Sequence, residues 1–382
     1  MKLGNIFEKK NELNRNQFTE NRTISIATMT FKPSGNGADE NSIPKYKVLR
    51  LGDIAFEGHK NKDFAFGRFL MNDIGDGIIS PRFTFLHAKE KLDIDFWKYY
   101  IHHESIMRTI LVKSTKQGTM MNELVVTDFL KQGIKVPEKS EQKIIGIFLT
   151  RLDHTITLQQ RKRELLKKLK RGYLQQMFPA KDSVNPQLRF NEFNSNWEPY
   201  KLGEIAEIVG GGTPSTGVPE YWDGDIDWYS PTEIGESIYV AESLKKITES
   251  GLNKSSAKML PTGTILFTSR AGIGNTAILA KTGSTNQGFQ SILPKRNILD
   301  SYFIFSRTTE LKKYGEITGA GSTFIEVSGK QMAQMPICIP CFEEQKKIGI
   351  FFQKLDHGIT LQQSKVDKLK NLKQAYLQKL FP

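Results

Sequence analysis

The string "LDHTITLQQ" at residues 152–160 returns as "LDHGITLQQ" at residues 355–363, with one substitution. Residues 141–179 and 344–382, which contain these strings, align at an offset of 203 with about 25 of 39 positions identical, a repeat of a whole structural unit. Further towards the N-terminus, "KLGNI" at 2–6 also matches "KLGEI" at 201–205. The chain is therefore predicted to contain two copies of one unit, each a variable stretch followed by a constant stretch.

The constant stretches are predicted to be long amphipathic helices, because their apolar residues recur at spacings of three and four. Pro137 and Pro340 precede them, and Phe178-Pro179 and Phe381-Pro382 close them. A long helix with one apolar stripe needs a partner, and each helix begins at its own variable domain, so we expect the two helices to pair in opposite directions. The predicted fold is α+β: two globular domains separated by two long antiparallel helices, a coiled coil, with an internal pseudo-two-fold repeat.

Two glutamine pairs interrupt the apolar stripe near the middle of these helices, at 159–160 and 362–363. A polar break in a coiled coil typically fixes the register at a cost in stability. The residues expected at the subunit interface are Leu152, Ile156, Gln159, Gln160, Leu166, Leu169, Tyr173, Leu355, Ile359, Gln362, Gln363, Leu369, Leu372 and Tyr376.

The repeated Asp-His pairs, at 153–154 and 356–357, do not indicate a catalytic dyad. Adjacent residues on a helix do not face each other, so local helix contacts are expected for them. The basic run "RKRELLKKLKR" at 161–171 fits a solvated face, a face beside DNA phosphates, or a face towards an acidic partner subunit.

Composition excludes several classes of protein. Two cysteines are too few for a disulfide framework, the chain has no run of about 18 apolar residues, and the first residues do not resemble a signal peptide. A cytoplasmic, reduced protein without contact to a membrane is expected. The net charge of +13 favours an acidic partner such as nucleic acid, and most of the excess lies in the two constant stretches.

Both variable stretches have the pattern of α+β domains. Residues 48–58 and 259–269 each show a turn glycine followed by a short apolar strand. The Asp-Gly pairs within 73–85 and 221–230 predict β-hairpins, and helices are expected at about 93–113 and 299–314.

Side chains that can read base edges or hold phosphates gather in a few loops of each variable stretch. For any single one of them, ordinary surface solvation is the competing interpretation. The candidates in the first stretch are His59, Lys60, Asn61, Lys62, Arg68 and Arg82. The candidates in the second are Thr213, Ser215, Thr216, Ser269, Arg270, Asn275, Asn286, Gln287 and Gln290, with flexible backbone amides expected in "VGGGTPST" at 209–216.

The sequence contains no convincing motif for a metal site, a nucleotide-binding site or a catalytic site. "CIPC" at 338–341 is half of a zinc pattern without a second half, and its counterpart in the first copy is "KVPE" at 135–138. The glycine-rich segments match neither the dinucleotide-binding nor the P-loop pattern, and no methyltransferase or nuclease motif is present. No catalytic residue, metal or bound cofactor is therefore expected in this chain.

Together, these features resemble the specificity (S) subunit of type I restriction–modification systems. The resemblance covers nearly the whole chain and is most specific in the constant helices. Its marks are Glu141, Gln142, Asp153 and Phe178-Pro179, then Glu344, Gln345, Asp356 and Phe381-Pro382, and "GGGTPSTGVPEYWDGDIDWYSPTEI" at 210–234. The implied organisation is a target-recognition domain at 1–137, a spacer helix at 138–179, a second target-recognition domain at 180–340 and a second spacer helix at 341–382.

The resemblance implies that each domain reads one half of a split, asymmetric site on double-stranded DNA, while the helices set the distance between the halves. It also implies that two methyltransferase (M) subunits, which methylate adenine N6 with S-adenosylmethionine, assemble on the helices, and that restriction (R) subunits using ATP and Mg join them. This chain itself would be non-catalytic. The alternatives are a self-contained DNA-modifying enzyme and a structural coiled-coil scaffold without DNA.

One departure concerns the segment "LRFNEFNSNWEP" at 188–199, which leads into the second copy. The family usually shows a similar lead-in at the N-terminus, whereas this sequence begins directly at "MKLGNI".

Overall fold

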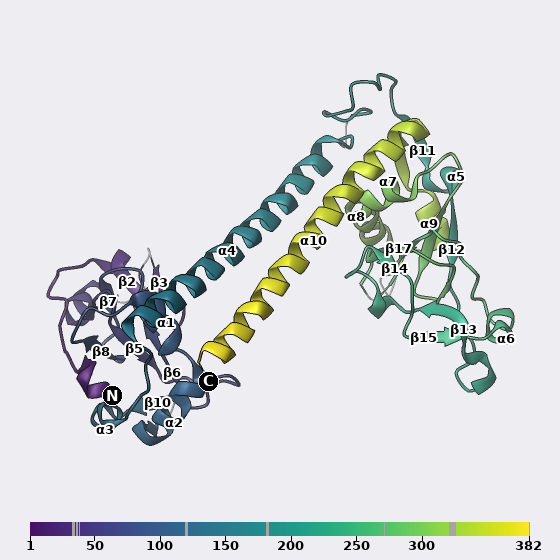
Figure 1. Cartoon of the computed structure of the whole chain (residues 1–382). Helices are drawn as coiled ribbons and strands as arrows, with labels where there is room; N and C mark the ends of the chain where they lie inside the picture. The colour runs from purple at the N-terminus through teal and green to yellow at the C-terminus, as the bar shows by residue number, and fades with distance from the viewer. Residues whose placement is uncertain are drawn as a thin grey trace. The chain divides into compact units, whose positions relative to one another are not determined.

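The structure is a computed structural model that describes residues 1–32, 35, 37, 39–118, 121–180, 183–270, 272–320 and 326–381. They form two compact units: unit 1 holds residues 1–161 and 363–382, and unit 2 holds residues 162–362. Both marked chain ends belong to unit 1 (Figure 1). Pro382, expected to close the second helix, lies outside the described residues. Among the described residues, no helix combines the length and apolar character needed to cross a membrane.

Unit 1 contains two four-stranded sheets and a two-stranded ribbon. The first sheet has the antiparallel order β1-β8-β5-β6; the second has the order β3-β2-β7-β4, in which β2 and β7 are parallel. The strands are β1 (Phe7–Glu8), β2 (Thr23–Ser25), β3 (Thr30–Lys32), β4 (Lys47–Leu49), β5 (Ile54–Glu57), β6 (Arg68–Met71), β7 (Gly77–Ile79), β8 (Thr84–Ala88), β9 (Thr115–Gln117) and β10 (Asn122–Leu124). The helices are α1 (Ile94–Tyr100), α2 (Glu104–Ser114) and α3 (Val126–Lys131), with 3-10 turns at Leu3–Asn5, Glu20–Arg22 and Glu40–Lys45.

Unit 2 contains a five-stranded sheet of order β12-β19-β16-β17-β14, a three-stranded sheet of order β15-β13-β18 and the pair β11-β20. Its strands are β11 (Glu198–Lys201), β12 (Ala206–Gly210), β13 (Trp222–Tyr229), β14 (Tyr239–Val240), β15 (Lys245–Ile247), β16 (Ile265–Phe267), β17 (Thr276–Leu279), β18 (Ser284–Thr285), β19 (Gln290–Pro294) and β20 (Pro336–Ile339). Its helices are α5 (Leu202–Ile205), α6 (Glu249–Asn253), α7 (Ser301–Ser306), α8 (Thr308–Gly319) and α9 (Gly329–Ala333), with 3-10 turns at Pro219–Tyr221 and Pro231–Glu233.

The turn glycines are confirmed at equivalent places in the two units. Gly52, before β5, has φ +89°, and Gly263, before β16, has φ +88°. Only glycine adopts this left-handed backbone without steric cost, which explains why each apolar strand follows a glycine.

The two predicted hairpins are wrong. Strand β6 pairs with β5, whereas β7 pairs with β2 and β4 in another sheet, so the Asp-Gly pair at the start of β7 does not join two paired strands. In unit 2 the Asp-Gly pair lies inside β13, where the register shifts between Trp222 and Ile226 as in a bulge. Asp223 there has φ +58°, a conformation that aspartate tolerates better than most residues.

Each of the two predicted helices is interrupted. The helix predicted at about 93–113 is divided into α1 and α2, and the helix predicted at about 299–314 is divided into α7 and α8.

The two constant stretches form the long helices α4 (Lys139–Gln176) and α10 (Phe342–Leu380) (Figure 1). At their starts, Gln142 Nε2 donates to the carbonyl of Pro137 at 2.8 Å, and Gln345 Nε2 donates to that of Pro340 at 2.9 Å. The repeated glutamine therefore ties each helix to the proline that precedes it. A buried phenylalanine follows the end of each helix: Phe178 lies in the core of unit 2 and Phe381 in the core of unit 1.

Within each unit, α4 and α10 run in opposite directions. In unit 1, Phe148 of α4 packs edge-on against Tyr376 of α10, with 4.8 Å between ring centroids. In unit 2 the equivalent pair is Tyr173 of α4 and Phe351 of α10, at 4.9 Å. Residues early in one helix thus meet residues late in the other, and the contacts repeat at the sequence offset of 203. The predicted α+β fold with two long antiparallel helices and an internal repeat is confirmed.

Candidate nucleic-acid interface

In unit 1, the register of the first sheet brings the candidate DNA-reading residues to one edge. Glu57, the last residue of β5, pairs with Arg68, the first residue of β6. Phe56 pairs with Thr84 at the start of β8. The loop after β5, the first residue of β6 and the turn before β8 therefore meet at this edge. They carry His59, Lys60, Asn61, Lys62, Arg68 and Arg82.

These side chains differ in their freedom to contact DNA. Arg68 donates to Glu57 at 2.6 Å and to the carbonyl of Ala27 at 3.1 Å, so part of its hydrogen-bonding capacity is used within the domain. The Asn61 side-chain oxygen accepts the amides of Asp63 and Phe64, both at 2.9 Å, and shapes the loop. The four remaining candidates, His59, Lys60, Lys62 and Arg82, are exposed.

In unit 2, the corresponding edge lies at the ends of β12, β16 and β19 in the five-stranded sheet. Gly210 at the end of β12 pairs with Gln290 at the start of β19, and Ile265 of β16 pairs with Ile292 of β19. The segments after β12, after β16 and before β19 therefore lie at one end of the five-stranded sheet. They carry Thr213, Ser215, Thr216, Ser269, Arg270, Asn275, Asn286, Gln287 and Gln290.

Contacts within this second edge hold its loops together. The Thr213 hydroxyl donates to the Gln287 side chain, which joins the loop after β12 to the loop before β19. The Asn286 side chain accepts the amide of Gly288 at 2.8 Å. Ser269 is fully buried, and its hydroxyl has no hydrogen-bond partner among the described residues, so it does not reach the surface in this structure.

The glycines of "VGGGTPST" serve close packing. A Cβ atom at Gly211 would lie 1.9 Å from the carbonyl oxygen of Asn286, and one at Gly212 would lie 2.2 Å from the amide nitrogen of Ala257. Any side chain at these two positions would clash with backbone atoms. The two glycines thus allow the loop to pack closely against its neighbours, and the expected flexibility of its backbone amides stays a prediction.

Each α+β domain is joined to the helix pair through an aspartate. In unit 1 the carboxylate of Asp153 on α4 accepts the Tyr99 hydroxyl of α1 at 2.6 Å and lies 2.6 Å from Lys373 Nζ of α10. Burial, with the neighbouring Asp153 charge adding to it, raises the pKa of Tyr99. The phenol therefore stays protonated and donates to the carboxylate.

Unit 2 repeats this junction. Asp356 on α10 accepts the Tyr302 hydroxyl of α7 at 2.9 Å, and Lys170 Nζ of α4 lies 2.6 Å from the carboxylate. Burial, then the charge of Asp356, raises the pKa of Tyr302. The expectation of local helix contacts for these aspartates is wrong, since each bonds a domain and the opposite helix. All three partners recur at the offset of 203, so extending the repeat comparison to single tyrosines and lysines would have found both junctions.

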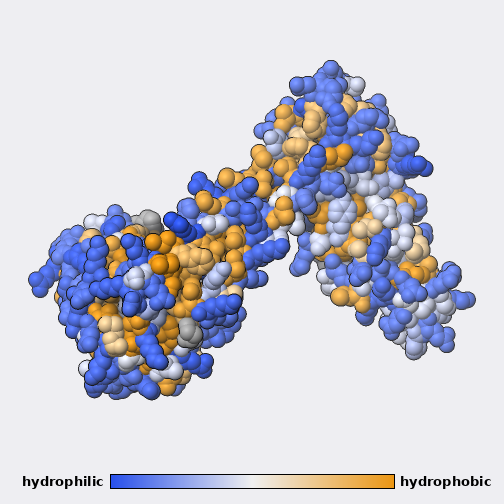
Figure 2. All heavy atoms as spheres, viewed as in Figure 1, coloured by the Kyte–Doolittle hydropathy of each residue, from blue (hydrophilic) through white to orange (hydrophobic). Residues whose placement is uncertain are grey.

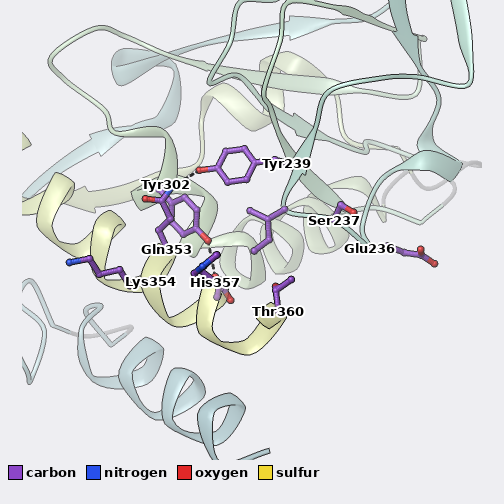
Figure 3. Close-up of a pocket in the computed structure, with 10 residues that line it drawn as sticks. Glu236, Ser237, Tyr239, Tyr302, Gln353, Lys354, His357 and Thr360 are labelled. Carbon is purple, nitrogen blue, oxygen red and sulfur yellow. Dashed lines mark hydrogen bonds between the residues drawn. The ribbon is translucent and has the colours of Figure 1, made fainter. Parts of the chain in front are cut away.

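A cavity of about 600 Å³ lies beside the Asp356 junction in unit 2 (Figure 3). Tyr239 and Tyr302 line it from the domain, and Gln353 and His357 line it from α10. Gln353 donates to the Tyr239 hydroxyl at 2.8 Å. The hydrogen-bonded pairs of this cavity, Tyr239 with Gln353 and Tyr302 with Asp356, hold the domain to the helix. Among the described residues, no group of three or more possible metal ligands occurs.

The predicted interface residues divide by exposure. Ile156 and Gln362 are buried, whereas Leu169, Leu372 and Tyr376 are 46%, 45% and 37% exposed. The others are partly buried: Leu152, Gln159, Gln160, Leu166, Tyr173, Leu355, Ile359, Gln363 and Leu369. The set thus includes both buried positions between the helices and positions that are exposed.

These features define a class of protein: a duplicated two-domain chain whose α+β domains are each bonded to one antiparallel helix pair. The chain belongs to the family of the type I restriction modification DNA specificity domain, whose family model matches residues 1–168 and 194–371.

Two relatives and one solved structure illustrate the match. The chain is 38% identical over 164 residues to the type I restriction enzyme MjaIX specificity subunit of Methanocaldococcus jannaschii, which covers 42% of this chain and 38% of the relative. It is 22% identical over 381 residues to the putative MjaX specificity subunit of the same organism, covering 94% of this chain and 84% of the relative. The type I restriction–modification S subunit from M. genitalium shares the fold, with a TM-score of 0.62, 17% identity, and coverage of 100% of this chain and 95% of that one.

Proposed function

We propose that this chain is the non-catalytic DNA-specificity subunit of a type I restriction–modification complex, and that each domain reads one half of a split, asymmetric site. The observation that carries this proposal is the equivalence of the two units. Each places base-reading side chain types at one edge of a sheet, and each is bonded to the helix pair through the same tyrosine, aspartate and lysine. The loop sequences at the two edges differ, so the two half-sites would differ as well.

The helix pair, in this proposal, is both a spacer and a platform. Helices bonded to each domain by fixed side chains would hold the distance between the two half-sites. Apolar side chains are exposed at equivalent positions of both helices: Ile147 and Ile350, Leu158 and Leu361, Leu169 and Leu372. Hydrophobic residues interrupt the mostly hydrophilic surface along the helices in Figure 2. Because the same surface occurs twice in one chain, it suits two copies of one partner, the M subunit.

The cofactors would belong to the partners. S-adenosylmethionine would bind the M subunits and supply the methyl group for adenine N6, and ATP with Mg would bind the R subunits. The role proposed for this chain is to place a chosen adenine within reach of each M subunit.

The test is a domain exchange in the complex assembled with M subunits. Residues 7–130 are replaced by the equivalent segment of a family member of known specificity, and methylated adenines are mapped on genomic DNA. One half-site should change while the other half-site stays the same. A change in both halves, or in neither, would contradict one half-site per domain.

The alternatives predict different results in the same preparation. A structural scaffold without DNA would show no sequence preference in a mobility-shift assay on bipartite DNA. A self-contained enzyme would bind S-adenosylmethionine or methylate DNA without the M subunits.

A further inference from the structure

A cleft in unit 1, here named the lysine cleft, gathers several lysine side chains. It is a cavity of about 380 Å³ between the loop after β1, the first residues of β4 and β8, and the segment from β10 to α3. Its polar lining consists of Lys9, Lys10, Asn11, Lys47, Thr84 and Thr127. None of the described residues that line it is acidic, so the chemistry of the lining suits an anion.

The register of the first sheet places the lysine cleft at the edge that carries the predicted DNA contacts. Strand β1 pairs with β8 in antiparallel register, with Glu8 opposite His87, so the loop at residues 9–11 runs on towards Thr84 at the start of β8. On its other side, Thr84 pairs with Phe56 near the end of β5. The loop after β1 therefore lies at the same end of the sheet as the loop after β5.

Lys47 joins the cleft to the turn before β8. Its Nζ donates to the carbonyl of Phe83 at 2.8 Å, and Phe83 follows the exposed Arg82 in the chain. Arg82 is one of the predicted DNA contacts. A DNA backbone that reaches Arg82 would therefore pass next to the lysine cleft.

Two cations of the cleft have no carboxylate partner. Among the described residues, neither Lys9 nor Lys47 forms an ion pair, whereas Lys10 Nζ lies 3.6 Å from Glu12. Burial, then the charge of Lys9, lowers the pKa of Lys47. The two ammonium groups therefore repel each other beside an acid-free cavity, and an anion between them would offset the repulsion.

Unit 2 does not repeat the lysines of this loop. In the alignment of "KLGNI" with "KLGEI", Ile208 and Val209 stand where unit 1 has Lys9 and Lys10. Strand β12 continues through both positions, whereas β1 ends before them. The loop after β1 therefore brings charge to unit 1 at a place where unit 2 has apolar strand residues.

We propose that the lysine cleft binds a backbone phosphate of double-stranded DNA at the half-site that unit 1 reads. Lys9 and Lys47 would contact the phosphate oxygens, and Lys10 would contribute less because Glu12 offsets part of its charge. Such a contact fixes the position of the domain on the duplex and carries no base information. The inference rests on the proposed function and adds to it an unequal share of phosphate binding between the two half-sites.

The test is a set of DNA-binding isotherms at several salt concentrations, with the full chain assembled with M subunits. Lys9→Met and Lys47→Met should each make the dependence of log affinity on log salt shallower by about 1 and weaken binding about tenfold at 0.1 M salt. Specific and unrelated DNA should be affected by the same factor. Lys91→Met is the matched control, because this exposed lysine lies beyond the other end of β8.

Two variants keep a folding defect apart from a lost phosphate contact. Lys47→Met also removes the hydrogen bond to Phe83, so Lys47→Arg, which keeps the charge, should retain the salt dependence of the unchanged chain. Lys9 is exposed, so Lys9→Met should unfold in urea like the unchanged chain. A salt dependence of Lys9→Met equal to that of the unchanged chain would overturn the proposal.

A second measurement identifies the anion. Single phosphates of the half-site read by unit 1 are replaced by neutral methylphosphonates. At one position the replacement should weaken binding by the unchanged chain and have no further effect on Lys9→Met, because both changes remove the same contact. Additive effects at every position would show that the cleft holds no DNA phosphate, which is the result expected if it holds free inorganic phosphate.

An acidic segment of an M subunit is the other occupant to separate from DNA. In that case Lys9→Met would weaken assembly with the M subunits in the absence of DNA, a result that would overturn the proposal. Equal assembly together with a shallower salt dependence supports it. The half-sites are mapped separately by adenine methylation, so failure of the phosphate contact is distinguishable from failure of the proposed function.

Discussion

Lys373 Nζ lies 2.6 Å from Asp153 Oδ1, a contact that joins the end of α10 to the middle of α4 inside unit 1. Lys170 and Asp356 make the same contact in unit 2, also at 2.6 Å, with the roles of the two helices exchanged. Each aspartate also accepts a tyrosine hydroxyl from its domain. In each unit, the carboxylate of one aspartate therefore holds the two helices together and attaches the domain of that unit to them.

We expect Lys373→Met to lower the free energy of unfolding by about 1 kcal/mol, because the pair is partly exposed. Lys170→Met should cost more, about 2–3 kcal/mol, since the Asp356 side chain is only 10% exposed and would be left without its cation. Urea unfolding measures both changes, and the exposed Lys365→Met is the control. In a double-mutant cycle of Lys373→Met with Asp153→Asn, strictly additive effects would show that the contact contributes nothing.

Arg189→Gln should destabilise unit 2 by about 3 kcal/mol, because it leaves the buried Glu344 carboxylate unpaired. The hydrogen bond to Glu344 raises the pKa of Arg189, so the arginine is charged throughout the accessible pH range. Arg296→Gln, at an exposed arginine of the same unit, is the matched control. Equal unfolding free energies for the two variants would refute a structural role for the pair.

Substitutions of two arginines at the unit 1 edge should affect different properties, one the stability of the domain and the other its binding to DNA. Arg68 is bonded to Glu57, so Arg68→Ala should lower stability by about 1–2 kcal/mol. Arg82 lies over the Phe83 ring at 4.8 Å and forms no ion pair among the described residues. Arg82→Ala should therefore leave stability within about 0.5 kcal/mol and weaken DNA binding by the M-subunit complex, reducing the salt slope by about 1. Binding isotherms at several salt concentrations check this; unchanged DNA affinity in Arg82→Ala would remove this residue from the interface.

Lengthening the helices should change the spacing of the site and not its sequence. Four residues inserted after Gln160 and four after Gln363 add about 6 Å to each helix, close to the rise of two base pairs. Mapping of methylated adenines should show the original half-sites separated by a longer spacer. New half-site sequences with an unchanged spacer would be incompatible with a helical ruler.

Acid should destabilise unit 1 through Glu12. A hydrogen bond from Arg50 lowers the pKa of Glu12 below its ordinary value of 4.5. The folded pKa lies below the unfolded one, so this contribution is present above pH 4.5 and is lost as the pH falls through the folded pKa. Glu12→Gln should flatten the acid side of the stability profile, measured by urea unfolding at several pH values. Burial raises the pKa of Glu104, so its ionisation lowers the stability of the folded state as the pH rises. Glu104→Gln should therefore make the acid side of the stability profile steeper.

The candidate site was predictable in part. The sequence predicts the loops that carry His59 and Arg270 as candidates because base-reading side chain types cluster there. Their meeting at one sheet edge depends on pairs such as Glu57 with Arg68 and Gly210 with Gln290. The burial of Ser269 depends on what packs over it, which the order of residues does not show.

The duplication, the two long helices and their antiparallel pairing could be predicted from the order of residues. The duplication follows from the repeat, the helices follow from the apolar spacing, and the pairing follows from the connectivity, because each helix begins at its own domain. Packing between elements places the Asp-Gly pair of β13 in a bulge, bonds each aspartate to a tyrosine and a lysine, and buries Glu344 against Arg189. The order of residues does not show these contacts, because they join residues far apart in the chain and depend on how whole elements pack together.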